Sequence, residues 1–174
     1  MDLPPGRIEA AGDQIDPVFL DTPQLVSDRL SEESGREVVV KFETLNPIGS
    51  FKGRGTSLLA AQLDPGDTWV CETAGNFGQG LAYAGRSREA AVQIFVGRNA
   101  PDGKVARMRA LGAEVEVSEH PHSAAREYAA ADEGRYLVVD GVEPAGAAGV
   151  AALNRHPGSL VGERVAVLLT GAAA

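Results

Sequence analysis

The chain has 174 residues, of which 44% are hydrophobic, so it can bury a core in one domain or in two small ones. Its formal net charge of −8 and the absence of any lysine- or arginine-rich block argue against a nucleic-acid surface. The single cysteine excludes an intramolecular disulfide and a cysteine-based zinc cage. No signal peptide or membrane-spanning run is found, so we expect a cytoplasmic protein.

Turn residues and apolar runs divide the first third of the chain into five segments. These are, in order, a flexible arm at residues 1–17, a helical stretch from Pro23 to Ser34, a buried strand at Glu37–Phe42, a turn at residues 45–49 and a helix from Ser50 to Leu63. The arm is rich in Gly, Pro and Asp, and the last helix stops at Asp64-Pro65-Gly66.

Strands and helices alternate with short connections through the middle of the chain. The predicted strands are residues 68–71, 91–96, 114–117 and 136–139, and the predicted helices are residues 78–88, 102–111 and 123–131. This alternation is typical of a parallel sheet covered by helices, and the apolar strands fit burial on both faces. The pattern therefore predicts an α/β fold.

The last part of the chain has a different composition. Residues 141–149 are mostly small, a helix is expected up to about Arg155, and Arg164–Leu169 predicts a final strand. The sequence then closes with Thr170-Gly171-Ala172-Ala173-Ala174.

Lys52 stands at a position suited to amine chemistry. It follows an Asn-Pro-x-Gly turn and opens a predicted helix, in a chain with only three lysines. The positive end of a helix disfavours a charged lysine, which favours the neutral and nucleophilic amine. An ordinary solvated lysine on the first turn of a helix is equally compatible with this position, so Lys52 alone does not establish a catalytic amine.

A second segment, residues 73–80 (TAGNFGQG), lies between a predicted strand and a helix. Backbone N–H groups at such a turn bind carboxylates or phosphates, and glycines let a ligand approach the backbone. The spacing G-x-x-G-x-G is not the dinucleotide fingerprint. A tight turn without a ligand, in which Asn76 adopts an unusual backbone angle, remains the alternative.

Four segments together resemble the fold-type II pyridoxal-phosphate (PLP) enzymes, a family that includes threonine and serine dehydratases, threonine synthase and serine racemase. The segments are Thr22-Pro23, residues 41–54 (KFETLNPIGSFKGR), residues 72–82 (ETAGNFGQGLA) and residues 111–115 (LGAEV). The resemblance implies a fold like that of tryptophan synthase beta, with a parallel sheet flanked by helices. It also implies that pyridoxal 5'-phosphate is the cofactor and that an amino acid is the small-molecule substrate.

The resemblance assigns a role to individual residues. Lys52, in the S-F-K-x-R-G element, is the expected catalytic residue and binds the cofactor covalently. The [ST]-x-G-N loop is expected to bind the substrate carboxylate through the backbone N–H groups of Thr73, Ala74, Gly75 and Phe77. Asn76 of the same substrate-binding loop is expected to hydrogen-bond the phenolic oxygen of the cofactor, and Thr170 to contact its pyridine nitrogen. No metal is expected.

The sequence departs from the family beyond residue 141. Up to there it follows the N-terminal half of the family, and from about Glu143 it resembles the extreme C-terminus, as if an internal deletion joined the two. The glycine-rich run that binds the cofactor phosphate in the family is absent. Each charge-assisted hydrogen bond of such a loop contributes about 1.5–3 kcal/mol, so its loss weakens cofactor binding strongly. Residues 141–149 are a candidate replacement.

These features predict a domain division and a function. Residues 18–52 and 142–174 are expected to form a remnant of the larger PLP domain, and residues 53–141 a small α/β domain. The expected function is a PLP-dependent lyase of the threonine/serine dehydratase type, which converts a hydroxy amino acid to a 2-oxo acid and ammonia. A threonine synthase-like enzyme and a non-catalytic truncated remnant are the alternatives. An open sheet edge would favour association, so a homo-oligomer is also an expected partner state.

Several other residues have simpler interpretations. Cys71, Trp69 and Phe95 are expected in the core. His120 and His122 are expected in a solvated loop, and His156 near the end of a helix. The group Arg107-Met108-Arg109 is interpreted as a solvated helix face.

Overall fold

The structure is a computed structural model that describes residues 12–139 and 164–169. The helices are α2 (Pro17–Leu20), α3 (Asp28–Ser34), α4 (Lys52–Ala60), α5 (Asn76–Ser87), α6 (Asp102–Ala110) and α7 (Pro121–Ala130). The strands are β1 (Gln24–Val26), β2 (Glu37–Phe42), β3 (Thr68–Glu72), β4 (Val92–Gly97), β5 (Glu114–Ser118), β6 (Arg135–Leu137) and β7 (Arg164–Leu169). No helix in these two ranges is long and apolar enough to cross a membrane.

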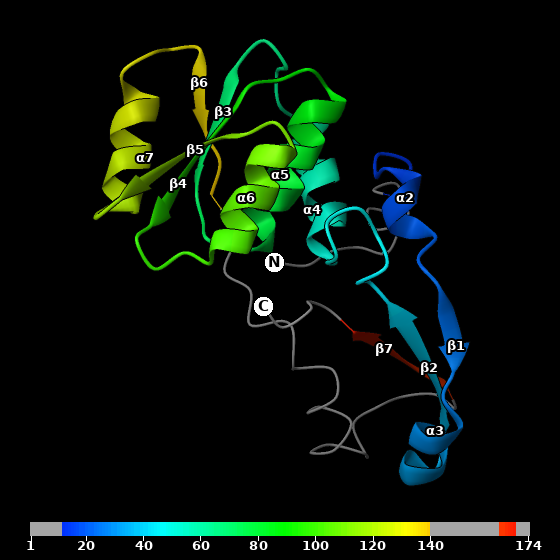
Figure 1. Cartoon of the computed structure of the whole chain (residues 1–174). Coiled ribbons are helices and arrows are strands. Elements are labelled where there is room, and N and C mark those ends of the chain that lie inside the picture. The colour runs from blue at the N-terminus through cyan, green and yellow to red at the C-terminus, as the bar shows by residue number, and fades with distance from the viewer. Residues whose placement is uncertain (1–11, 140–163, 170–174) are drawn as a thin grey trace.

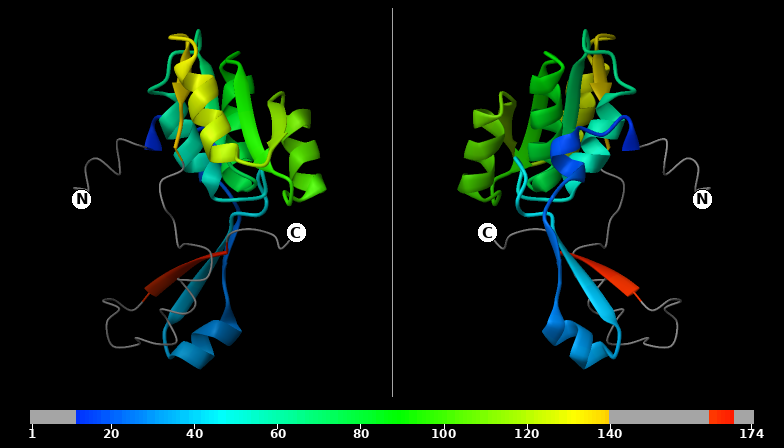
Figure 2. Two further views of the ribbon diagram at one scale, coloured as in Figure 1. Left: turned by 90° about the vertical axis from the view of Figure 1, so that its left-hand side faces the viewer. Right: turned by 90° about the vertical axis from the view of Figure 1, so that its right-hand side faces the viewer.

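The strands form two sheets. Four parallel strands lie in the order β5-β4-β3-β6. The second sheet has the order β1-β2-β7, in which β1 is antiparallel and β7 parallel to β2. Figures 1 and 2 show the second sheet, with α3, extending away from the first. The predicted α/β fold with a parallel sheet and flanking helices is confirmed, and β1 is an antiparallel addition to it.

Helices cover both faces of the four-stranded sheet. Figure 1 shows α7 on one face and α5 and α6 on the other, with α4 packed beside α5. Successive strand residues point to opposite faces, so Val70 and Phe95 pack against α7, at Ala125 and Ala129. The opposite face packs against α5 and α6 and includes Trp69, Cys71, Ile94, Leu81 and Met108.

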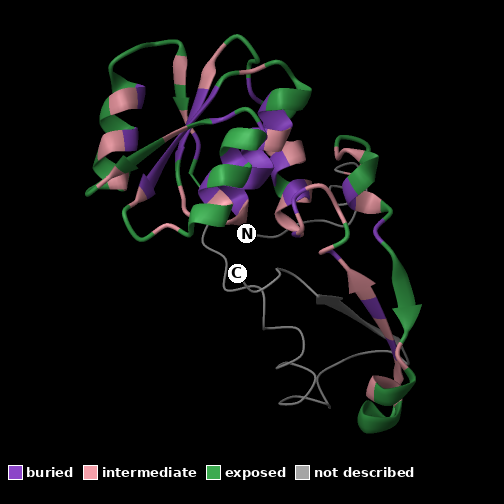
Figure 3. Ribbon diagram, viewed as in Figure 1, coloured by how far each residue is buried: buried purple, intermediate pink, exposed green. Residues whose placement is uncertain are grey.

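The core lies in this layered part of the molecule. Figure 3 shows the buried residues gathered in β3, β4 and α5, whereas β1 and α3 are mostly exposed or half-buried. Trp69, Phe95 and Cys71 are buried, which confirms the three core predictions. Leu25 and Val26 of β1 are both about half exposed, at 52% and 46%. The three-stranded sheet therefore has little core of its own among the described residues.

The helix predicted after Pro23 is wrong in its first part. Gln24–Val26 is the strand β1, because it pairs with residues 39–41 of β2. Helix α3 begins only at Asp28, where the Ser27 side chain accepts a hydrogen bond from the Leu30 N–H at 3.4 Å. It ends at Gly35, whose positive φ of 67° closes the helix.

Some predictions fall outside the described residues. These are the small-residue segment 141–149, the helix expected up to about Arg155, His156 and residues 1–11 of the predicted arm. Residues 12–17 of that arm are described, and the Asp16 carboxylate there accepts a hydrogen bond from the Tyr83 hydroxyl of α5 at 3.1 Å.

Two glycines of α4 provide a matched pair for testing this packing. A Cβ on Gly53 would lie 2.2 Å from the ring of Phe19, which is fully buried and packs edge-on against Tyr83. A Cβ on Gly55 would meet nothing within 4 Å. We expect Gly53→Ala to lower the free energy of unfolding by about 1–3 kcal/mol through overpacking. Gly55→Ala should raise it by about 0.5–1 kcal/mol through better helix propensity.

Urea unfolding of both variants measures this difference. Because the two sites lie two residues apart on one helix, the same helix propensity gain applies to each. Equal effects of the two substitutions would show that the Phe19 ring does not pack on Gly53 in solution.

Candidate active site

The turn between β2 and α4 is held together by one side chain. The Asn46 amide donates to the carbonyl oxygens of Glu43 at 2.6 Å and Ser50 at 2.9 Å. Its Oδ1 accepts from the N–H groups of Ile48 at 3.1 Å and Ser50 at 3.3 Å. An asparagine that bonds its own backbone in this way stabilises a turn. Gly49 completes the turn with a positive φ of 63°. The predicted turn thus leads directly into the helix that carries Lys52.

Lys52 is the first residue of α4 and is half-buried. Its backbone N–H donates to the Ser50 hydroxyl at 3.3 Å. Its Nζ lies 5.5 Å from the ring centroid of Phe51 and 5.9 Å from that of Phe77. Because Phe77 is the second residue of α5, the amine lies near the N-terminal ends of two helices.

The loop that follows β3 leads into α5 at Asn76. Gly75 is the N-cap and makes no side-chain cap bond, so the helix begins with an uncapped end. The first N–H groups of a helix have no partner within the helix and can bind an anion. The sequence places the start of this helix at about Gly78, and the structure places it two residues earlier, inside the glycine-rich turn.

Two of the N–H groups assigned to the substrate are engaged within the chain. Thr73 N–H donates to the Phe95 carbonyl at 3.1 Å, and Gly75 N–H donates to the Thr73 hydroxyl at 3.1 Å. Within the described ranges, no hydrogen bond is found for the N–H groups of Ala74, Asn76 and Phe77. Of the four N–H groups expected to bind the substrate carboxylate, those of Thr73 and Gly75 thus donate within the chain, whereas those of Ala74 and Phe77 have no partner among the described residues.

Asn76 lines a cavity of about 500 Å³ beside this turn. The cavity is walled by the β2–α4 turn, by Asn76 and Gln79 of α5, and by the start of α6, including Lys104 and Arg107. The Gln79 side chain is buried and donates to Asn76 Oδ1 at 3.3 Å, which orients the asparagine amide. Among the described residues predicted for the site, Asn76 alone lines this cavity.

The interpretation of residues 107–109 as a solvated face is wrong. Met108 is fully buried against the sheet, because helical periodicity turns it inward between two exposed arginines. Arg107 lines the cavity and donates to the Pro47 carbonyl of the β2–α4 turn. Arg107 stands three residues after Lys104, so the two cations lie on the same face of α6. This spacing is the feature of the sequence that could have indicated their common position.

Sequence reasoning also missed a buried ion pair beside the site. Glu43 is fully buried, and its Oε1 accepts from Arg54 at 2.6 Å and from the Thr22 hydroxyl at 3.2 Å. Its Oε2 and the Arg54 Nε have no hydrogen-bond partner in the part of the chain that the structure describes. The pair joins the end of β2 to α4 two residues after Lys52.

The remaining predicted site residue, Thr170, lies outside the described residues. The strand before it, β7, pairs with β2 so that Leu169 lies opposite Phe42. This is the end of β2 from which the chain turns towards Lys52. His120 and His122 are exposed as expected, but His122 lies in α7, not in a loop, and contacts Glu72 at 3.4 Å.

A family described as "Pyridoxal-phosphate dependent enzyme" matches residues 15–142, which is most of the chain and includes the whole candidate site except Thr170. The chain belongs to this family. Its members depend on pyridoxal 5'-phosphate, in agreement with the cofactor expected from the sequence.

Individual members of the PLP family have different activities. Cysteine synthase 1 of Neurospora crassa is 41% identical over 100 residues, which cover 54% of this chain and 27% of that protein. The biosynthetic L-threonine dehydratase of Mycobacterium leprae is 39% identical over 108 residues, which cover 60% of this chain and 25% of that protein. The crystal structure of serine racemase from Dictyostelium discoideum matches with a TM-score of 0.68 and 28% identity, covering 75% of this chain and 44% of that one.

These comparisons fix the family and the fold but span only part of each relative. The chain covers about a quarter of the length of the two curated relatives and less than half of the solved racemase. The fold-type II architecture is shown by the structural match together with the parallel sheet and flanking helices.

The chemistry of the described residues fits part of the PLP molecule. The Lys52 amine suits its aldehyde group, and the Asn76 amide suits its phenolic oxygen. An uncapped helix N-terminus lies next to both and suits an anionic group.

Proposed function

We propose that the chain is a PLP-dependent lyase of the threonine/serine dehydratase type, which converts serine or threonine to a 2-oxo acid and ammonia. The observation that carries the proposal is the short distance between the Lys52 amine and the first turn of α5, at 5.9 Å from the Phe77 ring. An amine and a carboxylate-binding turn must lie side by side for an amino acid to reach both. The dehydratase of Mycobacterium leprae among the relatives supports this substrate class.

Each residue of the site has a role in this proposal. Lys52 binds the cofactor covalently, and Asn76, oriented by Gln79, donates to its phenolic oxygen. The N–H groups of Ala74 and Phe77 hold the substrate carboxylate, in a turn whose Thr73 and Gly75 N–H groups donate within the chain. Thr170 contacts the pyridine nitrogen. When bound, PLP supplies a ring that stores the electron pair left at the α-carbon.

The proton transfer falls to Lys52. Once the substrate amine has taken its place on the cofactor, the freed Lys52 Nζ takes the proton from the α-carbon of the substrate as a general base. Loss of the β-hydroxyl then balances the removed proton as water, and hydrolysis of the resulting product gives the 2-oxo acid and ammonia. The half-buried position of Lys52 between the rings of Phe51 and Phe77 limits access of water to the amine.

A non-catalytic remnant is the second candidate, and a specific observation favours it. The sequence has no glycine-rich run like the phosphate loop of the family. In this case residues 53–141 fold as a small domain, and residues 18–52 with 142–174 are a remnant of the larger PLP domain. The NPIGSFK segment resembles threonine synthase, whereas the AGNFGQGLA and YLVVDG segments resemble the dehydratases.

Product analysis of the purified chain with added PLP distinguishes these candidates. We expect serine or threonine to yield a 2-oxo acid and ammonia in equal amounts. Threonine formed from O-phosphohomoserine, cysteine formed from O-acetylserine and sulfide, or D-serine formed from L-serine would replace the lyase by a synthase or a racemase. If PLP binds but no product forms from any substrate, the chain is the non-catalytic remnant.

A further inference from the structure

A second cavity lies at the opposite ends of the helices that carry the candidate site. It has a volume of about 230 Å³ and is walled by residues 13–16, by the end of α4 and by the end of α5. Helix α5 begins at Asn76 and ends at the C-cap Arg88, about 18 Å further along at 1.5 Å per residue. None of the residues predicted to bind cofactor or substrate lines it among those described. The cavity is therefore separate from the candidate active site.

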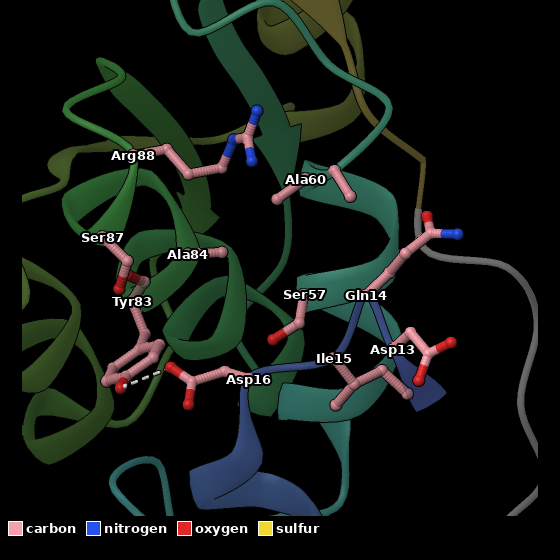
Figure 4. Close-up of a pocket in the computed structure, with 11 residues that line it drawn as sticks. Asp13, Gln14, Ile15, Asp16, Ser57, Ala60, Tyr83, Ala84, Ser87 and Arg88 are labelled. Atoms are coloured by element: carbon pink, nitrogen blue, oxygen red, sulfur yellow. Dashed lines mark hydrogen bonds between the residues drawn. The ribbon is translucent and has the colours of Figure 1, made fainter. Parts of the chain in front are cut away.

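The two ends of this cavity carry opposite charges. Figure 4 shows the Arg88 guanidinium and the Asp16 carboxylate on opposite sides, with Ala60, Ala84 and Ser57 between them. Among the described residues, no ion pair or hydrogen bond is found for the Arg88 side chain. Asp13 adds a second carboxylate on the side of Asp16. The C-terminal ends of α4 and α5, where helix carbonyls concentrate negative charge, favour the Arg88 cation at this side of the cavity.

The acidic side of the cavity is held in place. Asp16 Oδ1 accepts from the Val18 N–H at 3.0 Å and Oδ2 accepts from the Tyr83 hydroxyl at 3.1 Å. Burial, and then the hydrogen bond to Asp16, raise the pKa of Tyr83, so the phenol remains a donor through neutral pH. Both carboxylate oxygens keep a lone pair for a further donor, such as an ammonium group.

The walls between the charged ends are small and apolar. Ala60, Ala84 and Ile15 leave room for a short aliphatic group. The volume is below the range of about 300–1,000 Å³ that holds drug-sized ligands. A ligand that fits therefore carries an ammonium at one end, an anionic group at the other and little bulk between them.

We propose that this cavity binds a short linear ω-amino acid, at a site separate from the candidate active site. Arg88 binds its carboxylate, and Asp16 and Asp13 bind its ammonium. The methylene groups of the ligand pack against Ala60, Ala84 and Ile15. The proposal does not depend on the lyase activity, because the cavity shares no residue with that site.

Calorimetric titration of the chain with 4-aminobutanoate, in the absence of PLP, tests the proposal. We expect 4-aminobutanamide, which lacks the carboxylate, and 4-acetamidobutanoate, which lacks the ammonium, each to bind at least about tenfold more weakly. L-Alanine should also bind more weakly, because its two charged groups share one carbon and cannot reach both ends. Equal binding of 4-aminobutanoate and both analogues, or no binding of 4-aminobutanoate at millimolar concentration, would overturn the proposal.

Variants locate the binding to this cavity. Arg88→Met and Asp16→Asn should each weaken 4-aminobutanoate binding about tenfold or more. Arg86→Met is the matched control, because Arg86 lies on the same helix, with its guanidinium 5.7 Å from the Tyr83 ring centroid, and does not line the cavity. Circular dichroism verifies that each variant is folded. Lys52→Ala should bind as the unmodified chain does. Loss of binding in Lys52→Ala but not in Arg88→Met would move the amino acid to the other site and refute the assignment.

Discussion

Replacement of Lys52 by alanine is expected to abolish the visible absorption band that forms when PLP is added to the chain. The band requires a covalent bond between the cofactor aldehyde and a buried amine, and Lys52 Nζ lies beside the uncapped turn of α5. Lys52→Arg keeps the positive charge without a reactive amine, so it should lose the band as completely as Lys52→Ala. Absorption spectra of the three proteins at equal PLP concentration measure this.

Because the chain has few lysines, the lysine that binds the cofactor can be identified directly. Lys41, Lys52 and Lys104 are the three in the chain. Lys41 donates to the carbonyls of Leu20 and Thr22, at 2.9 and 2.8 Å, and so has a structural role. Borohydride reduction followed by peptide mapping should find the cofactor on the Lys52 peptide. Labelling at Lys104 instead, or an unchanged spectrum in Lys52→Ala, would contradict the proposed site.

The layered part of the fold was predictable because its strands are short apolar runs between turn residues. Its four parallel strands begin and end within a residue or two of those expected, and in the other sheet Glu37–Phe42 and Arg164–Leu169 have the predicted bounds. The central strands β3 and β4 are covered by helices on both faces, so their residues are mostly apolar and this run is visible in the sequence. An apolar run of this kind can be recognised without knowing which helices pack against the strand.

Elements that depend on a distant partner were not predictable in the same way. β1 is a strand because β2 pairs with it, and its own three residues, Gln24–Val26, are exposed on both sides. The inward turn of Met108 depends on where α6 docks on the sheet. A local sequence window contains neither docking geometry nor strand pairing.

The candidate site likewise has a part that the sequence predicts and a part that depends on tertiary contacts. Lys52 and the turn around Asn76 were found from a resemblance that spans several segments, and the structure brings the two together. The engagement of the Thr73 and Gly75 N–H groups depends on a hydrogen bond to β4 and on a side-chain rotamer. The cavity beside Asn76 needs three segments to form its walls, so no single motif predicts it.

Loss of Arg54, the half-buried partner of a fully buried carboxylate, should be the most destabilising single change considered. Glu43 is fully buried and Arg54 is its ion-pair partner at 2.6 Å, with 31% of the arginine side chain exposed. Removal of one partner from a buried pair leaves an uncompensated charge and lowers the free energy of unfolding by about 3–5 kcal/mol. We expect Arg54→Met to show this loss in urea unfolding. Glu43→Gln should lose less, because the partly exposed arginine can turn to water.

An exposed pair in the same chain is the control. Arg29 and Glu33 of α3 lie 3.1 Å apart with side chains 87% and 61% exposed, so Arg29→Met should change stability by about 0.5 kcal/mol or less. The double variant Glu43→Gln/Arg54→Met removes both charges and should recover most of the stability that Arg54→Met loses. If Arg54→Met were no more harmful than Arg29→Met, the Glu43 carboxylate would have access to water. The turn that leads to Lys52 would then be held by the Asn46 hydrogen bonds and not by the ion pair.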